Sequence, residues 1–191
     1  STPSGPDREA AAAFASHRLG LKAMEKKILP LMIFLLLVLV CLGQVLWHYP
    51  RLPAEVACHF NPAGQPDGWC GKGQFLRLQV GTISILAASF LGFGLALTRL
   101  PDALINMPNK KYWLAPERRQ KTLDHLRNCL LWLGTLTMLY WFDLAGQTFQ
   151  VHMGQTDRLN HVWLSLGLYL AAVAAWALAM VFKCRKGKNE G

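Results

Sequence analysis

The side chains most able to do chemistry in this chain are gathered in the short segment 58–70. It holds two cysteines twelve positions apart, Cys58 and Cys70, with His59 and Asp67 between them. A disulfide between the cysteines would close a loop and stabilise the fold by about 3 kcal/mol, and two free thiols are the alternative. All four residues are metal-ligand types, but their spacing fits no standard zinc pattern such as paired C-x-x-C. We therefore predict no metal, with His59 acting as a hydrogen-bonding group.

A single carboxylate, Asp143, lies inside a long apolar stretch, residues 129–149. An ionisable group in hydrocarbon is costly and normally faces the interior of a helix bundle or a water-filled cavity. We expect Asp143 to belong to a polar cluster near one membrane surface, with a histidine or Arg77 as its partner. The alternative is a carboxylate whose hydrogen bonds only hold helices together.

The sequence contains none of the common catalytic patterns, namely the G-x-S-x-G elbow, H-E-x-x-H, a phosphate-binding loop or G-x-G-x-x-G. We therefore predict no catalytic residues and no cofactor, and a protein that acts by binding rather than by turnover. A small membrane-embedded enzyme or transporter is the alternative.

Four apolar stretches must position these groups, and each can cross about 30 Å of hydrocarbon as a helix. Their apolar residues cover every side of the helix, unlike those of a soluble amphipathic helix. We predict an all-α, polytopic membrane protein, in which residues 48–77 form a small lid or hairpin between the first two helices. Residues 28–182 form this membrane domain, and its spans are 28–47, 78–97, 129–149 and 161–182.

Lysine and arginine positions predict the orientation, because short basic loops remain on the cytoplasmic side. Sixteen of the twenty basic residues lie in the N-terminal arm, in segment 98–128 and in the C-terminal tail. Both termini and the loop 98–128 are therefore predicted to be cytoplasmic, and the loop 48–77 external. Residues 1–27 are expected to form an amphipathic helical leader, and 183–191 a basic tail. Attraction to anionic lipid accounts for the net charge of +9, so the predicted partner is the lipid bilayer and not nucleic acid.

Glycine and proline positions predict how the helices pack and begin. Gly81, Gly92 and Gly94 in the second span suit close contact between helices. Pro116 suits the first turn of a helix that runs into the third span, because a proline lacks the backbone donor that this turn does not need.

Two motifs carry a resemblance to a known family. The first joins Leu52-Pro53, His59-Phe60-Asn61, Gly64, Pro66-Asp67-Gly68-Trp69 and Lys72; the second runs from Asn106 to Arg119. The chain resembles the bacterial membrane family called domain of unknown function 1648. That domain is also found at the front of the membrane immunity protein against the sporulation-delaying toxin. The resemblance implies a multi-pass protein of the bacterial inner membrane and says little about activity.

The expected function is binding, sensing or immunity through the 48–77 loop, with an extracellular peptide or lipid as ligand. An accessory subunit of a larger membrane complex, or a homo-oligomer, is the alternative. The candidate binding residues are His59, Asn61, Asp67, Trp69, Lys72, Glu117, Arg118, Arg119 and Asp143.

Overall fold

The computed structural model describes the backbone of residues 5–186 and the side chains of residues 28–183, together with those of Phe14 and Arg18. The apolar and basic side chains predicted to make the leader amphipathic lie mostly outside the described residues, as does the end of the basic tail. The elements, in chain order, are α1 (Gly5–His48), η1 (Tyr49–Arg51), β1 (Glu55–Phe60), β2 (Pro66–Gly71), α2 (Lys72–Leu97), η2 (Asp102–Leu104), α3 (Lys110–Trp113), α4 (Pro116–His152) and α5 (Val162–Lys186).

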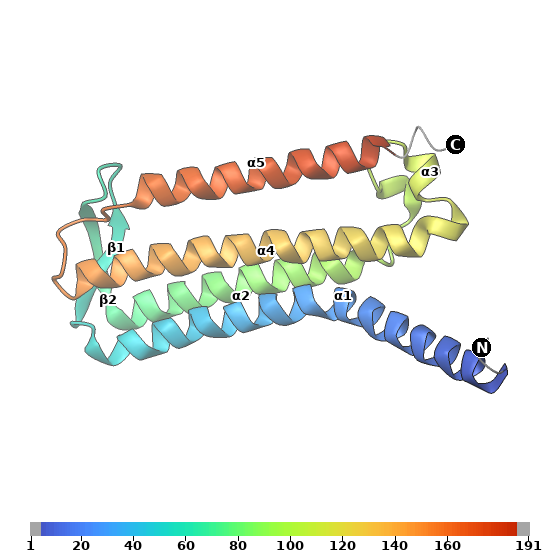
Figure 1. The fold of residues 1–191 in the computed structure, drawn as a ribbon. Helices are drawn as coiled ribbons and strands as arrows, with labels where there is room; N and C mark the ends of the chain where they lie inside the picture. Colours follow the sequence, from blue (N-terminus) through green and yellow to red (C-terminus); the bar gives the residue numbers. More distant parts are fainter. Residues whose placement is uncertain (1–4, 187–191) are drawn as a thin grey trace.

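Four of the helices, α1, α2, α4 and α5, are long and apolar enough to cross a membrane. They run lengthwise beside one another, with the β1–β2 hairpin at one end and α3 at the other (Figure 1). We call these the hairpin end and the far end. The predicted fold class is confirmed: the chain is a multi-pass membrane protein with four candidate spans and a small hairpin between the first two.

The helices extend beyond the apolar stretches that predicted them. α2 begins at Lys72 and not at residue 78. The apolar stretch missed the first turns of this helix because they contain the polar residues Gln74 and Arg77. α4 begins at Pro116, as the proline predicted, and continues without a break to His152. An apolar run therefore marks the part of a helix that meets hydrocarbon and misses the polar turns that extend into the interface.

α1 is one helix of 44 residues that contains Pro30. A proline inside a helix removes one backbone hydrogen bond and its ring clashes with the preceding turn, so the helix kinks there. The N-terminal part of α1 bends away from the bundle (Figure 1), and Pro30 is itself buried against the bundle. The kink thus separates the predicted leader from the predicted span without ending the helix.

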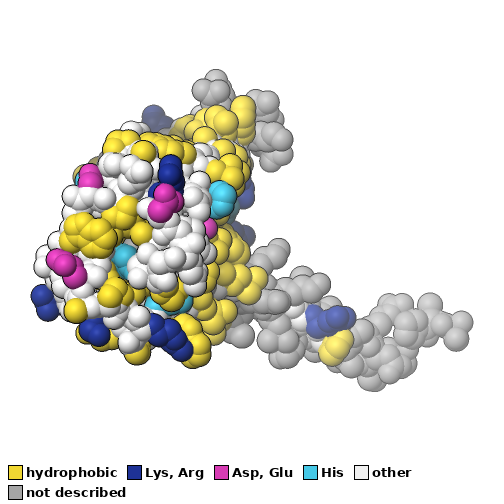
Figure 2. Space-filling model, turned by 90° about the vertical axis from the view of Figure 1, so that its left-hand side faces the viewer, with side chains coloured by type: hydrophobic (Ala, Val, Ile, Leu, Met, Phe, Trp, Pro, Cys, Tyr) yellow, Lys and Arg dark blue, Asp and Glu magenta, His cyan; other side chains and the backbone are white. Residues whose placement is uncertain are grey.

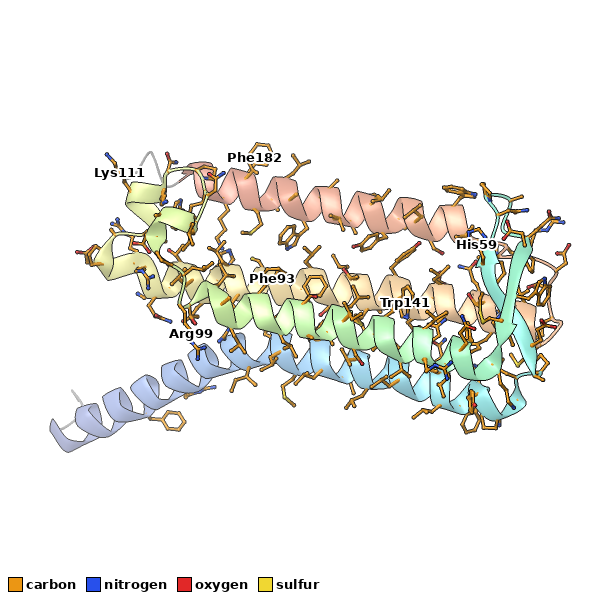
Figure 3. All side chains as sticks on the ribbon, turned by 180° about the vertical axis from the view of Figure 1, so that it is seen from behind. His59, Phe93, Arg99, Lys111, Trp141 and Phe182 are labelled. Carbon is orange, nitrogen blue, oxygen red and sulfur yellow. A yellow bond between two sulfur atoms is a disulfide. The ribbon has the colours of Figure 1, made fainter. Side chains whose placement is uncertain are left out.

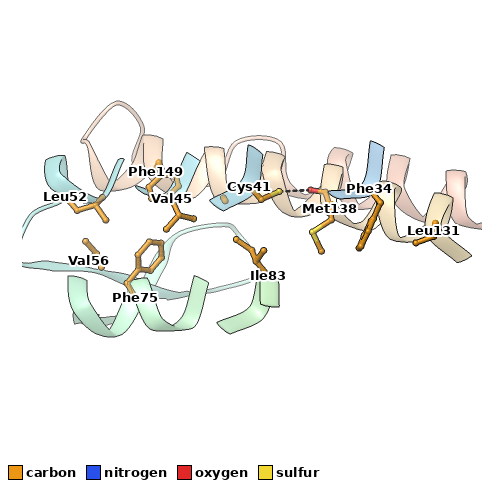
Figure 4. Close-up of a cluster of buried hydrophobic side chains, with 11 residues drawn as sticks. Phe34, Cys41, Val45, Leu52, Val56, Phe75, Ile83, Leu131, Met138 and Phe149 are labelled. Carbon is orange, nitrogen blue, oxygen red and sulfur yellow. Dashed lines mark hydrogen bonds between the residues drawn. The ribbon is translucent and has the colours of Figure 1, made fainter. Parts of the chain in front are cut away.

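The hydrophobic core lies between α1, α2 and α4 (Figure 4). Phe34 and Cys41 on α1, and Leu131, Met138 and Ala145 on α4, are spaced by seven residues and so face one way. The Cys41 thiol donates a hydrogen bond to the Met138 carbonyl, at 3.6 Å. The remaining buried members of this core are Val45, Leu52, Val56, Phe75, Ile83 and Phe149.

α5 stands apart from this core and packs along α4 (Figure 1). Much of that contact is polar or aromatic. The Tyr140 and Tyr169 rings stack with centroids 4.9 Å apart, and the hydroxyls of Thr137 and Tyr169 are 3.1 Å apart. α5 is therefore held to α4 by side-chain contacts at the edge of the bundle.

Among the helical glycines of the described residues, Gly134 on α4 has the closest neighbours from other helices. A Cβ atom there would lie 2.8 Å from the ring atoms of both Phe34 and Phe90. The expectation for α2 was wrong at two positions, because a Cβ at Gly81 or Gly92 would meet no atom of the described residues within 4 Å. At Gly94 only an ordinary contact of 3.4 Å with Arg127 would form.

Replacing Gly134 with alanine should lower the melting temperature in detergent, because overpacking of this kind costs about 1–3 kcal/mol. Gly81→Ala is the matched control, and it should be neutral or stabilising by up to about 1 kcal/mol, since alanine is the better helix former. Thermal unfolding followed by circular dichroism measures both. Equal shifts in the two variants would show that α4 does not pack at Gly134 as described.

Candidate functional site

The hairpin is a two-stranded antiparallel ribbon whose register shifts between Ala57 and His59. Cys58, at this irregularity, forms a disulfide with Cys70, and their Cα atoms are 5.8 Å apart. Gly68 faces His59 across the strands, where a Cβ would lie 2.9 Å from the histidine Cβ. The glycine of the Pro66-Asp67-Gly68-Trp69 motif therefore lets the two strands approach beside the disulfide.

The turn of the hairpin is shaped by its own side chains. The Asn61 carboxamide oxygen accepts hydrogen bonds from the backbone N–H groups of Ala63 and Gln65, at 2.9 and 3.0 Å. Gly64 has φ +78°, and a Cβ there would meet the carbonyl oxygen of Leu159 at 2.7 Å. Both the left-handed backbone and the close approach favour glycine.

Three hydrogen bonds tie the hairpin to the ends of α4 and α5. A His152 ring nitrogen, Nε2, lies 2.9 Å from the Ala57 carbonyl oxygen. The Leu159 N–H donates to the Gly64 carbonyl at 2.9 Å, and the Trp163 indole N–H donates to the Pro62 carbonyl at 2.8 Å. The hairpin is thus fixed over the bundle at β1 and at its turn.

A pocket of about 300 Å³ lies beneath the hairpin, between β1 and the ends of α2 and α4. We call it the hairpin pocket. Figure 3 shows Trp141 on α4 and His59 on β1 at this end of the bundle. The lining of the hairpin pocket is mostly apolar and comprises Ala57, Cys58, His59, Phe60, Phe75, Gln79, Trp141, Leu144, Ala145, Thr148 and Leu159.

Two buried polar atoms of this lining have no hydrogen-bond partner among the described residues. They are the Gln79 carboxamide oxygen, an acceptor, and the Trp141 indole N–H, a donor. Gln79 is only 8% exposed. Leaving such a group unpaired costs about 1–3 kcal/mol, so native proteins rarely do it without a reason. The walls of the pocket therefore contain one unpaired acceptor and one unpaired donor, both buried.

An aromatic layer supports the pocket on its α1 side. The His48 ring stacks on Phe149 with centroids 4.5 Å apart, and Phe75 meets His152 edge-on at 4.9 Å. The Nδ1 atoms of both histidines are buried, and neither has a partner among the described residues. The two histidines therefore join α1 and α4 around the phenylalanine rings beneath β1.

Most of the hairpin residues predicted to bind lie on its surface and not in the pocket. His59 lines the pocket, but its ring pairs with Asp67 and is largely exposed. Trp69 is 62% exposed, and the Lys72 ammonium lies 5.5 Å from the centroid of the Tyr49 ring. The hairpin end as a whole is a mixed polar surface with apolar flanks behind it (Figure 2).

Asp143 was expected to pair with a histidine or Arg77, and the structure gives it a different partner. The Gln147 carboxamide donates to the Asp143 carboxylate at 2.7 Å and lies 3.3 Å from the Ser165 hydroxyl. The Gln147 oxygen accepts the backbone N–H of His161, just before α5, at 3.0 Å. Asp143 also lines a pocket of about 290 Å³ between α4 and α5. It is therefore the end of a hydrogen-bond chain that holds α5 to α4.

The predicted trio at the start of α4 is divided among different contacts. Arg119 bonds Asp102 at 2.9 Å and the Leu100 carbonyl at 3.2 Å, so it fixes the α2–α3 connection. Arg118 lies over the Tyr112 ring, 4.2 Å from its centroid, and lines a pocket at the far end. Glu117 is exposed in the first turn of α4, where a negative charge suits the helix dipole.

Within the described part of the chain, no three histidine, cysteine or acidic side chains are grouped closely enough to hold a metal ion. The residues that make the hairpin pocket were missed by sequence reasoning, apart from Cys58 and His59. Gln79, a polar residue inside an apolar stretch, was the signal that could have drawn attention to it.

Four membrane-crossing helices with a disulfide-bonded hairpin over one end define a multi-pass membrane protein with a pocket at that end. Residues 36–80 match the family model of the domain of unknown function 1648. The match includes the whole hairpin and Gln79, whereas Trp141 and the second sequence motif lie outside it. Comparisons with curated proteins and with solved structures gave no match.

Replacing Gln147 with leucine should lower the free energy of unfolding by about 1–3 kcal/mol, because the Asp143 carboxylate and the His161 N–H both lose a partner. Asp143→Asn keeps an acceptor for Gln147 and should cost less. Melting temperatures in detergent measure the difference.

Gln150→Leu is the matched control, since Gln150 is exposed on the same helix. A larger loss for Asp143→Asn than for Gln147→Leu would mean that the Asp143 charge matters beyond this hydrogen-bond chain.

Proposed function

We propose that this protein is a non-catalytic binding protein of the bacterial inner membrane, which holds an apolar ligand in the hairpin pocket. The two unpaired polar atoms, the Gln79 oxygen and the Trp141 N–H, carry the proposal. A ligand with one donor and one acceptor within an apolar body would satisfy both. A peptide group has this pair of functions, so a hydrophobic peptide segment is the class of ligand we infer.

The rigidity of the hairpin supports binding in a preformed site. The disulfide and the contact of His152 with Ala57 restrict β1, which forms the pocket wall. The bonds from Leu159 and Trp163 fix the turn that follows it. A site ordered before the ligand arrives loses little conformational entropy on binding. Sensing of a peptide, or immunity towards one, is the role that such a site would serve.

The distribution of basic residues supports an external position for the pocket. The 48–77 segment and the α4–α5 connection together contain four of the twenty lysines and arginines. Basic segments are retained on the cytoplasmic side, so the hairpin end faces outwards and both termini face the cytoplasm.

Two observations favour binding over the alternatives. The polar groups of the pocket are an amide, an indole and a threonine hydroxyl, and the His59 ring beside them is engaged by Asp67. None of these groups pairs a nucleophile with a base, as covalent catalysis by side chains would require. The exposed apolar side chains of the helices are covered by lipid in a membrane, so they do not by themselves call for a larger complex.

Gln79→Leu should weaken ligand retention, because it removes the acceptor that the ligand would pair. In the ligand-free protein the same change should raise the melting temperature, since the acceptor is then buried without a partner. Native mass spectrometry of the protein extracted from its own host membranes in mild detergent measures retention. We expect an additional mass on the wild type, reduced at least about tenfold in the variant, as the loss of one buried hydrogen bond implies.

Gln74→Leu, on an exposed position of the same helix, is the matched control and should keep the ligand. The proposal fails if the wild type carries no additional mass, or if the wild type and both variants retain it equally.

The orientation can be tested by adding one cysteine at a time to the wild-type chain at an exposed position. The two variants are Gln155→Cys at the hairpin end and Lys111→Cys at the far end. A membrane-impermeant maleimide applied to intact cells should label the first and spare the second. The wild type, whose Cys58 and Cys70 are disulfide-bonded, gives the background. Labelling of Lys111→Cys alone would place the hairpin in the cytoplasm.

A further inference from the structure

A second pocket, at the far end, gathers three cations from two helices. It has a volume of about 470 Å³ and lies between α4 and the end of α5. Arg118 and Lys121 line it from α4, and Lys183 lines it from α5. None of the described residues that line it is acidic. Three like charges around one pocket repel one another, and a bound anion would relieve that repulsion.

An apolar cleft continues from this cationic pocket towards the middle of the bundle. The cleft has a volume of about 300 Å³ and shares Met107 and Leu126 with the cationic pocket. Leu130 on α4 and Trp176 and Met180 on α5 form its walls. The two pockets therefore make one path that is cationic at its mouth and apolar further in.

The spacing of the lining residues explains this gradient. Trp176, Met180 and Lys183 follow one another by four and three residues, so they lie on a single face of α5. On α4, Arg118, Lys121, His125 and Cys129 follow one another by three, four and four residues, so they also share one face of their helix. Both helices thus change from cationic to apolar in the same direction.

We propose that this path is a binding site for one anionic phospholipid, with its phosphate among Arg118, Lys121 and Lys183 and an acyl chain beside Trp176 and Met180. The charge of the mouth selects an anion, and the adjoining apolar cleft requires an attached hydrocarbon chain. A free phosphate would fill only the mouth. The site lies at the end of the bundle opposite to the hairpin pocket, so it is independent of the function proposed above.

The test is native mass spectrometry of the purified, delipidated full chain, titrated with phosphatidylglycerol and with phosphatidylcholine of the same acyl chains. One phosphatidylglycerol should bind at least about tenfold more tightly than phosphatidylcholine, because each cation near a headgroup contributes about 1 kcal/mol. The double variant Lys121→Gln and Lys183→Gln should lose at least about tenfold of this affinity. The double variant with arginine at both positions should keep it.

A charge-matched control is the double variant Arg99→Gln and Lys111→Gln. Both residues are exposed at the far end, outside the cationic pocket and the cleft, and Figure 3 labels them. This control should bind phosphatidylglycerol as the wild type does. Trp176→Ala should weaken binding by loss of acyl-chain contact.

Three results would overturn the proposal. Equal affinity for the two lipids would show that charge does not select the ligand. Equal losses in the pocket variant and the Arg99 and Lys111 control would show a general surface attraction. Displacement of the lipid by a large excess of inorganic phosphate would identify a free-anion site, in which the apolar cleft plays no part.

Discussion

The lipid interior supplies no hydrogen bonds, and this constraint decides where the protein can place polar groups. Every backbone group at membrane depth must be satisfied inside a helix, so irregular backbone is confined to the two ends of the bundle. At the hairpin end, a ring nitrogen of His152 and the N–H groups of Leu159 and Trp163 meet carbonyls of the hairpin segment. The contacts that fix the hairpin thus also satisfy backbone carbonyls of the hairpin segment.

The same constraint explains which polar side chains within the helices indicate a binding site. Asp143 is satisfied through Gln147, and Gln147 in turn accepts the N–H that precedes α5. Gln79 and Trp141 are different, because a polar atom of each stays buried without a partner in the described structure. A carboxylate attracts attention in an apolar sequence, yet here the neutral amide and indole mark the pocket.

The fold could be predicted from the sequence further than the site could. Apolar runs of about twenty residues predict helices that cross a bilayer. The alternating residues of β1 and the turn residues around Asn61 and Gly64 predict the hairpin. The pocket depends on residues 57–60, 75–79, 141–148 and 159, which converge only when the helices pack. Two adjacent arginines also have different contacts, which their charge alone does not predict. Arg119 bonds Asp102 in the α2–α3 connection, whereas Arg118 lines a cationic pocket. The glycine contacts showed the same limit, since Gly134 meets two phenylalanine rings that lie far from it in the sequence.

The bond from Leu159 to Gly64 has a consequence for biogenesis. The ribosome completes the hairpin strands long before it synthesises Leu159 and Trp163, so the turn emerges without the groups that later hold it. Oxidation of Cys58 and Cys70 can join the strands early, whereas the hydrogen bonds to the turn form only after Leu159 and Trp163 have been synthesised. Maturation of the hairpin end is therefore a late event in assembly, and a chain interrupted before α5 would leave that end unfinished.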